Sequence, residues 1–168
     1  MATKHYTFQE NQAMMPTKII VVIVTLLVLL MGLFGYMYIA QEFLGKPVGE
    51  NALPAPWALA IFIVTGLLTF YVSRLKIITR VTDDVLTMSL GVIGKRKFPL
   101  ETIEAVKDYE GNPAADFLGY GYRIAIKQTG YIGRAEQAVT LKINGQKREL
   151  VITTEKPEEL KQALQPKG

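Results

Sequence analysis

Residues 19–40 read IIVVIVTLLVLLMGLFGYMYIA, a run of 22 residues without a charged side chain. At about 1.5 Å of rise per residue, a helix of this length reaches the roughly 30 Å that the hydrocarbon core of a bilayer requires. A second run, residues 56–73, is shorter, but the whole segment 52–73 is uncharged. A charged segment of about 90 residues with strand-like alternation follows. The sequence therefore predicts a membrane-spanning helical hairpin that carries one small β-rich domain.

The charges that flank the two runs predict the orientation of the hairpin. Lys4 and Lys18 precede the first run, and Arg74, Lys76 and Arg80 follow the second. Because loops on the cytoplasmic side of a membrane carry an excess of Lys and Arg, we expect both termini in the cytoplasm. A cleaved signal peptide is disfavoured, since its apolar region usually has only about 7–15 residues. The predicted divisions are a cytoplasmic N-terminal segment at 1–18, transmembrane helices at 19–40 and 56–73, an outward-facing loop at 41–55 and a cytoplasmic domain at 74–168.

Composition restricts the functions that the soluble part can perform. The 168 residues include no cysteine and a single histidine, His5, and the net charge is +4. Without cysteine the chain has no thiol nucleophile or iron–sulfur ligand, and a serine hydrolase would lack its usual base. The basic runs are too short for a nucleic-acid-binding stripe. We therefore expect a non-enzymatic protein with no metal, cofactor, small-molecule substrate or nucleic-acid partner.

The two apolar runs hold no ionisable side chain, which argues against an ion or proton pathway through this chain alone. The second run instead presents a face of small residues, Thr65, Gly66, Thr69 and Ser73. Small residues let helix backbones approach closely within a membrane. This face is expected either to pair within the hairpin or to dock against another membrane protein.

Alternating apolar residues predict strands in the first half of the soluble domain. Ile77, Thr79 and Val81 form one such series, and the Asp83-Asp84 pair supplies a turn before the returning strand. A third strand is expected near residues 96–99. The periodicity of residues 103–109 fits a strand or a short helix.

The second half of the domain shows a hairpin and a terminal helix. A loop with an Asn112-Pro113 turn is expected at residues 110–118, followed by alternation from Tyr122 to Ile126. Asn144-Gly145 is a strong hairpin signal, and residues 148–153 are expected to pair back on the strand before it. Pro157 suits the first turn of a helix with an apolar stripe. Short strands closed by one helix predict a small barrel or sandwich.

Three stretches carry a resemblance to a known family. They are FPLETI at 98–103, GYGYR at 119–123 and VITTEKPEEL at 151–160. Their order and spacing resemble the bacterial pleckstrin-homology-like (PH-like) domains that follow one or two membrane helices. The likeness covers about residues 55–165, with Tyr120 at a place where such domains more often have tryptophan. The resemblance implies a bent seven-stranded sheet capped by a C-terminal helix, in a multi-pass protein of the bacterial cytoplasmic membrane.

Two groups of residues are candidates for function. Six cations form a candidate surface for lipid or a protein partner: Arg74, Lys76, Arg80, Lys95, Arg96 and Lys97. The second group is the motif Gly119, Gly121 and Arg123. There Arg123 is expected either to pair with a carboxylate and brace the domain or to face a ligand.

The expected function is that of a docking or scaffold module in an accessory subunit of a larger membrane complex. Its partners would be membrane lipids and another integral membrane protein. The alternative is a membrane-surface sensor that binds anionic lipid head groups through the six cations. The Asp83-Asp84 turn argues against a specific inositide site, because related inositide-binding domains place basic residues at that turn.

Overall fold

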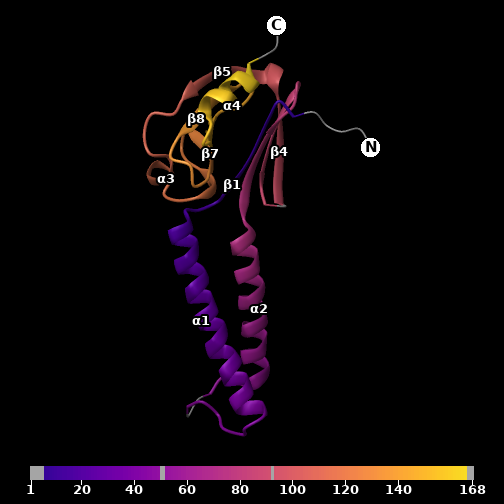
Figure 1. Ribbon diagram of the computed structural model, residues 1–168, viewed down its shortest axis with the longest axis vertical. Coiled ribbons are helices and arrows are strands. Elements are labelled where there is room, and N and C mark those ends of the chain that lie inside the picture. Colours follow the sequence, from indigo (N-terminus) through magenta and orange to yellow (C-terminus); the bar gives the residue numbers. More distant parts are fainter. Residues whose placement is uncertain (1–5, 50–51, 92, 166–168) are drawn as a thin grey trace, which may run out of the picture. The chain divides into compact units, whose positions relative to one another are not determined.

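The computed structural model describes residues 6–49, 52–91 and 93–165 (Figure 1). Lys4 and His5, singled out in the sequence, lie outside the described residues. The chain divides into two compact units. One, the helical unit, spans Thr17–Arg74; the other, the β unit, joins the segment up to Pro16 with everything from Leu75 onward.

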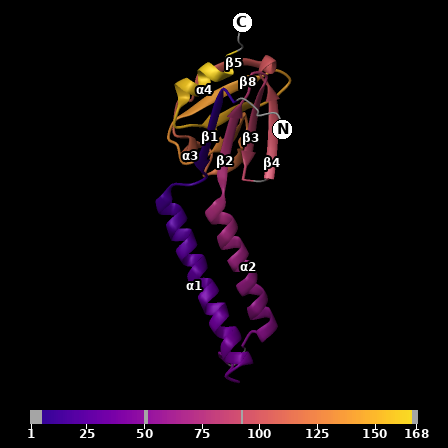
Figure 2. The ribbon, with the colours of Figure 1, turned by 45° about the vertical axis from the view of Figure 1, so that its right-hand side comes forward.

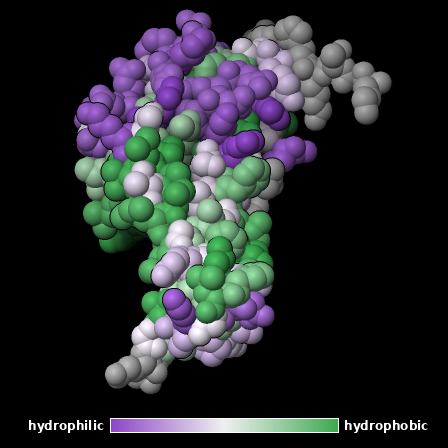
Figure 3. Space-filling model, turned by 60° about the horizontal axis from the view of Figure 1, so that its bottom comes forward, coloured by the Kyte–Doolittle hydropathy of each residue, from purple (hydrophilic) through white to green (hydrophobic). Residues whose placement is uncertain are grey.

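The helical unit consists of two helices, α1 at Thr17–Glu42 and α2 at Ala55–Arg74. Both are long and apolar enough to cross a membrane, judged by length and composition. Many of their large apolar side chains are more than half exposed, among them Val22, Leu29 and Leu67. Figure 3 shows hydrophobic residues gathered over the helices and hydrophilic ones over much of the β unit. Such a surface is suited to lipid rather than to water.

The two helices pack closely where glycine replaces a side chain. A Cβ built on Gly35 would lie 3.2 Å from ring carbons of Phe62, and one on Gly66 would lie 3.4 Å from the sulfur of Met31. A Cβ built on Gly32 would meet nothing within 4 Å. Gly35 and Gly66 therefore lie in the contact between α1 and α2, and Gly32 lies outside it.

Four antiparallel strands form the first sheet of the β unit, in the order β1-β2-β3-β4. They are β1 Phe8–Ala13, β2 Lys76–Val81, β3 Val85–Leu90 and β4 Ile93–Pro99. The predicted alternation is confirmed, since Ile77, Thr79 and Val81 are all buried. Strand β1 was not predicted, because residues 1–18 were expected only as a cytoplasmic N-terminal segment. Figures 1 and 2 show it running beside β2.

Five strands form the second sheet, in the order β5-β8-β9-β7-β6. A short 3-10 helix, η1 Leu100–Thr102, leads into it, and a single helical turn, α3 Pro113–Asp116, precedes β6. The strands are β5 Ile103–Asp108, β6 Gly121–Ile124, β7 Gln128–Ile132, β8 Ala138–Ile143 and β9 Glu149–Thr153. The predicted hairpin at Asn144-Gly145 joins β8 to β9, whereas β7 and β9 pair in parallel.

Several expectations are resolved by these two sheets. Residues 103–108 are a strand, and the Asn112-Pro113 loop contains a helical turn, in which the Asn112 side chain accepts a hydrogen bond from the Ala115 N–H. The described residues contain nine strands in two sheets, where the resemblance implied a single bent sheet of seven. The two additional strands include β1, which pairs across a large sequence separation.

The main core contains apolar side chains of both sheets and of the C-terminal helix, α4 Pro157–Leu164. Leu160 and Leu164 of α4 are buried in it, as the apolar stripe predicted. Lys161, on the same helix, donates hydrogen bonds to both carboxylate oxygens of Asp108 in β5, at 2.9 and 3.0 Å. A smaller apolar cluster, which includes Phe117 and Ile132, lies on the opposite face of the second sheet.

Candidate functional site

A cavity of about 320 Å³ lies on the outer face of the four-stranded sheet. Arg80, Thr87 and Lys97 occupy one row of the ladder across β2, β3 and β4, and Lys95 precedes Lys97 by two residues on the same face. The lining is completed by the chain before β1 and by the β2–β3 turn. The remaining lining residues are Tyr6, Thr82, Asp83, Asp84 and Val85. We call this the sheet pocket.

Arg80 is the most constrained cation of the sheet pocket. Its guanidinium carbon lies 5.5 Å from the centroid of the Tyr6 ring, a cation–π contact. Its Nε is buried and has no hydrogen-bond partner among the described residues. A buried donor without an acceptor is unfavourable, and Arg80, which carries it, lines the cavity.

The acidic side of the sheet pocket is set by the β2–β3 turn. The Thr82 hydroxyl both donates to the Val85 carbonyl and accepts from the Val85 N–H, each at 3.3 Å. The Asp84 carbonyl accepts a hydrogen bond from the Leu100 N–H at 2.8 Å. These bonds fix the turn, which places Asp83 and Asp84 in the lining of the same cavity as the three cations.

The structure separates the six predicted cations. Arg80, Lys95 and Lys97 meet in the sheet pocket, whereas Arg96 has its guanidinium carbon 4.9 Å from the centroid of the Tyr122 ring. The reason is the period of a strand, which sends Arg96 to the opposite face from its two neighbours. Two others do not line the pocket: Lys76 begins β2, and Arg74 ends α2 with its guanidinium carbon 4.9 Å from the centroid of the Phe70 ring.

The Gly119–Arg123 motif forms a turn that is held by its own arginine. The Arg123 Nε donates to the Tyr120 carbonyl at 2.9 Å. Gly119 has a φ of +131°, and a Cβ there would lie 2.9 Å from an Arg123 nitrogen. Gly121 has a φ of +93° and abuts the sulfur of Met14. The arginine thus contacts a backbone carbonyl, in place of the carboxylate that one of the two expectations named.

The residues of the small-residue face of α2 make their contacts largely within the helical unit. Thr65 is buried, and its carbonyl accepts a hydrogen bond from the Thr69 hydroxyl at 2.7 Å. The Ser73 hydroxyl donates to the Phe70 carbonyl at 2.8 Å. The burial of Thr65 and the approach of Gly66 to Met31 place this part of the face between α1 and α2.

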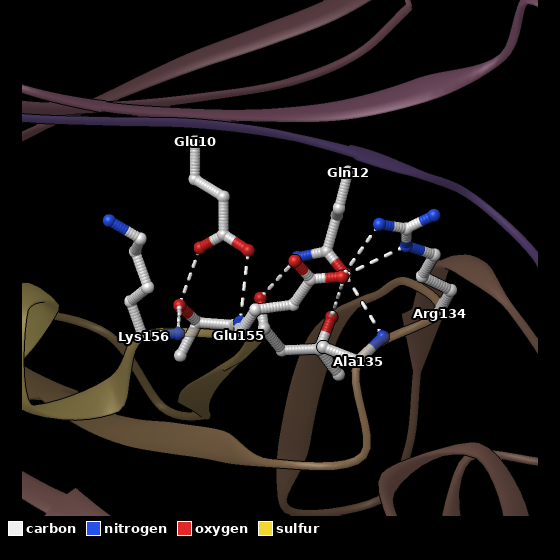
Figure 4. Close-up of polar contacts among 8 residues, drawn as sticks. Glu10, Gln12, Arg134, Ala135, Glu155 and Lys156 are labelled. Carbon is white, nitrogen blue, oxygen red and sulfur yellow. Dashed lines mark hydrogen bonds and ion pairs between the residues drawn. The ribbon is translucent and has the colours of Figure 1, made fainter.

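A buried polar cluster, which the sequence did not reveal, anchors β1 to the second sheet (Figure 4). The Gln12 side chain, 2 % exposed, donates from Nε2 to the Thr153 carbonyl. Its Oε1 accepts from the Ala135 N–H at 3.2 Å and from the Thr153 hydroxyl at 3.3 Å. One buried amide therefore satisfies groups from two other parts of the chain.

Glu10, two residues earlier on the same face of β1, makes the second half of the cluster. One carboxylate oxygen accepts from the Thr154 hydroxyl and the other from the Glu155 N–H at 2.9 Å. Glu155 in turn forms an ion pair with Arg134 at 2.8 Å. The cluster joins β1 to the segment between β9 and α4, and its satisfied hydrogen bonds assign it a structural role.

Within residues 6–49, 52–91 and 93–165, no group of three or more His, Asp or Glu side chains could hold a metal ion. The site with the most distinctive chemistry is the sheet pocket, which combines three cations, two carboxylates and an aromatic ring.

Comparison with known proteins identifies the chain by family. Residues 3–167 match the model of a family of unknown function, DUF6141. Since the match covers nearly the whole chain, this protein belongs to that family. Neither the curated proteins nor the solved structures contain a match to it.

Proposed function

We propose that this protein is a non-enzymatic integral membrane protein whose cytoplasmic β unit is a docking module, as an accessory subunit of a larger complex in the bacterial cytoplasmic membrane. The observation that carries the proposal is a set of large apolar side chains on the surface of the β unit. Ile126 is 91 % exposed, Leu118 is 89 % exposed and Ile124 is 62 % exposed. Exposed apolar residues outside the membrane helices are typical of contacts with a partner.

Ile126 lies at a fixed position between β6 and β7. Arg148 donates from Nε to the Ile126 carbonyl at 3.3 Å, and the Glu149 N–H donates to the Lys127 carbonyl at 3.1 Å. The backbone of this connection is therefore held by the start of β9. A backbone that is already ordered loses little conformational entropy on binding, which favours the use of Ile126 as an anchor.

Leu118 adds a second argument for docking. It has a φ of +53°, a conformation that costs a non-glycine residue free energy. Its side chain gains no burial in return. Lys127 and Arg148, which lie at the connection that carries Ile126, are exposed. The surface around Ile126 therefore fits a partner segment with apolar and acidic side chains.

The pairing of β1 with β2 supports the proposed topology. Ala13 pairs with Lys76, three residues separate Ala13 from α1, and Leu75 alone separates α2 from Lys76. Strands that share one ladder must lie on the same side of a membrane. The Lys and Arg residues beside both helices favour the cytoplasmic side.

We also infer that the β unit is a variant of the PH-like domain. Two antiparallel-rich sheets with the C-terminal helix packed on their shared core support this assignment. Strand β1 and the parallel pairing of β7 with β9 are departures from the seven-stranded pattern. A docking role without catalysis is compatible with a domain of this kind, although the fold alone does not identify a partner.

Co-purification from native membranes tests the proposal. The full-length protein, tagged at its C-terminus and expressed at its native level, is extracted in a mild detergent and sized, and its partners are identified by mass spectrometry. We expect a defined complex that Ile126→Asp or Leu118→Asp disrupts and that Gln146→Asp, at an exposed position of the β8–β9 turn, leaves intact. A free monomer for the wild-type protein would contradict the proposal.

A further inference from the structure

We propose that the sheet pocket binds a single phosphate group, carried by a soluble molecule or by a lipid head group. The cations that would hold it are Arg80, Lys95 and Lys97, which belong to β2 and β4. This inference does not depend on the docking proposal, which concerns a different surface of the β unit.

The hollow arises from the side chains in one row of the sheet. Arg80 and Lys97 both pair with Thr87, so two long cationic side chains flank a short one. Neighbouring strands lie about 4.8 Å apart, which puts the two cationic residues about 10 Å from each other at the backbone. Their flexible ends can converge above Thr87 on an oxyanion, and the Thr87 hydroxyl offers a further donor.

The ion pairs that the structure gives between described residues lie outside the sheet pocket. Five ion pairs join described residues, and their cations are Arg134, Lys142, Lys156 and Lys161. None of these five involves a cation of the sheet pocket. The contact of Arg80 with the Tyr6 ring holds the guanidinium but provides no hydrogen-bond acceptor, and no described residue supplies one to Nε. A guanidinium in the lining of a cavity can bind a phosphate through its N–H groups.

Protection of the sheet edge from pairing with other chains would explain only some of the cations in the sheet pocket. Strand β4 is an edge of its sheet, and lysines on edge strands prevent pairing with other chains. That role accounts for Lys95 and Lys97. It does not account for Arg80, which lies on β2 between two neighbouring strands, or for the ring of Tyr6 against it.

The two carboxylates of the sheet pocket limit the negative charge that its ligand can carry. Asp83 and Asp84 line the same cavity as the three cations, so the lining carries charges of both signs. A polyphosphate or a multiply phosphorylated inositol would be repelled by the carboxylates. A phosphate monoester or diester with one or two negative charges matches the pocket.

Calorimetric titration with inorganic phosphate tests the inference. The full-length protein is placed in nanodiscs of phosphatidylcholine, and ionic strength is held constant with chloride. We expect saturable binding that Lys97→Gln and Arg80→Gln each weaken about tenfold or more, the loss typical of one charge-assisted hydrogen bond. Lys107→Gln, which removes an exposed charge from β5, should leave it unchanged. Asp84→Asn should tighten it.

A second arm identifies the source of the phosphate. Nanodiscs that contain phosphatidylglycerol are compared with nanodiscs that carry the same negative charge on a phosphate-free lipid, because an anionic surface alone repels inorganic phosphate. An apparent affinity that is weaker only with phosphatidylglycerol means that the lipid head group occupies the pocket, and equal affinities mean a soluble ligand. The inference is overturned if no saturable binding occurs at concentrations that fill a millimolar site. It is equally overturned if Lys107→Gln weakens binding as much as Lys97→Gln. Lys95→Gln, at an exposed position, repeats the test should Arg80→Gln fail to fold.

Discussion

The side chain of Gln12 donates a hydrogen bond to the main-chain carbonyl of Thr153, 141 residues later in the chain. Through this bond the strand before α1 becomes part of the unit formed by the chain after α2. Both ends of the helical pair are therefore fastened to one folded unit.

Replacing Gln12 by leucine should destabilise the β unit. The substitution keeps the approximate volume but removes the partners of the Thr153 carbonyl, which is buried, and of the Ala135 N–H, which is partly buried. We expect a loss of about 2–4 kcal/mol in the free energy of unfolding. Thermal and denaturant unfolding followed by circular dichroism measure it. Gln9→Leu, at an exposed position of the same strand, is the control and should be nearly neutral.

Gly133 and Gln12 should be energetically coupled. A Cβ built on Gly133 would overlap the side-chain oxygen and carbon of Gln12, which leaves no room for alanine unless the amide moves. Gly133→Ala should therefore destabilise the wild-type protein but cost much less in the Gln12→Ala background. A double-mutant cycle of unfolding free energies measures this coupling. Additive effects would show that the two residues are not in contact.

The stability of the β unit should fall in alkaline solution through Tyr109. Burial, together with a hydrogen bond to the Asp116 carboxylate at 2.9 Å, raises the pKa of the Tyr109 phenol from 10.0 to about 12. The protonated phenol is favoured in the folded state, so its contribution is complete below about pH 10 and is lost as the pH rises towards 12.

Difference titration by ultraviolet absorbance, wild type minus Tyr109→Phe, isolates this phenol. Asp116→Asn should lower the pKa of Tyr109, because it removes the neighbouring negative charge. A pKa for Tyr109 that is identical in wild type and Asp116→Asn would contradict the contact.

Substitutions at two glycines of α1 should affect the stability of the helical pair differently. Gly35→Leu forces a side chain into the ring of Phe62, whereas Gly32→Leu enters open space. We expect the first substitution to destabilise the pair by about 1–3 kcal/mol, the usual cost of overpacking. Trp57, the sole tryptophan, reports the melting of α2 by fluorescence in detergent. Equal melting temperatures for the two variants would place the helix contact elsewhere.

Local sequence signals predicted the elements that depend on near neighbours. The alternation of β2, the Asn144-Gly145 hairpin and the helix that begins at Pro157 all follow from patterns a few residues long. Such signals survive in a single sequence because their causes are turn chemistry and periodicity.

Strand β1 was missed for a physical reason. In its sequence, FQENQA, a buried glutamine and a half-buried glutamate stand at inward-facing positions where a typical strand has apolar residues. Those polar groups are satisfied only by residues more than 120 positions away. The sheet pocket was partly predicted: three of its cations were named, but their convergence with Tyr6 and their separation from Arg96 depend on the register of the sheet.

Cysteine cross-linking between β1 and β2 in intact membranes tests the central claim most directly. The chain has no native cysteine, and Asn11 pairs directly with Ile78. Directly opposed residues have Cα atoms about 4.5–5.5 Å apart, within the range that a disulfide spans. Asn11→Cys with Ile78→Cys should therefore form a disulfide on mild oxidation. Asn11→Cys with Thr87→Cys, one strand further away, should not. An absence of cross-linking between positions 11 and 78, or labelling of the two cysteines from opposite sides of the membrane, would contradict the account.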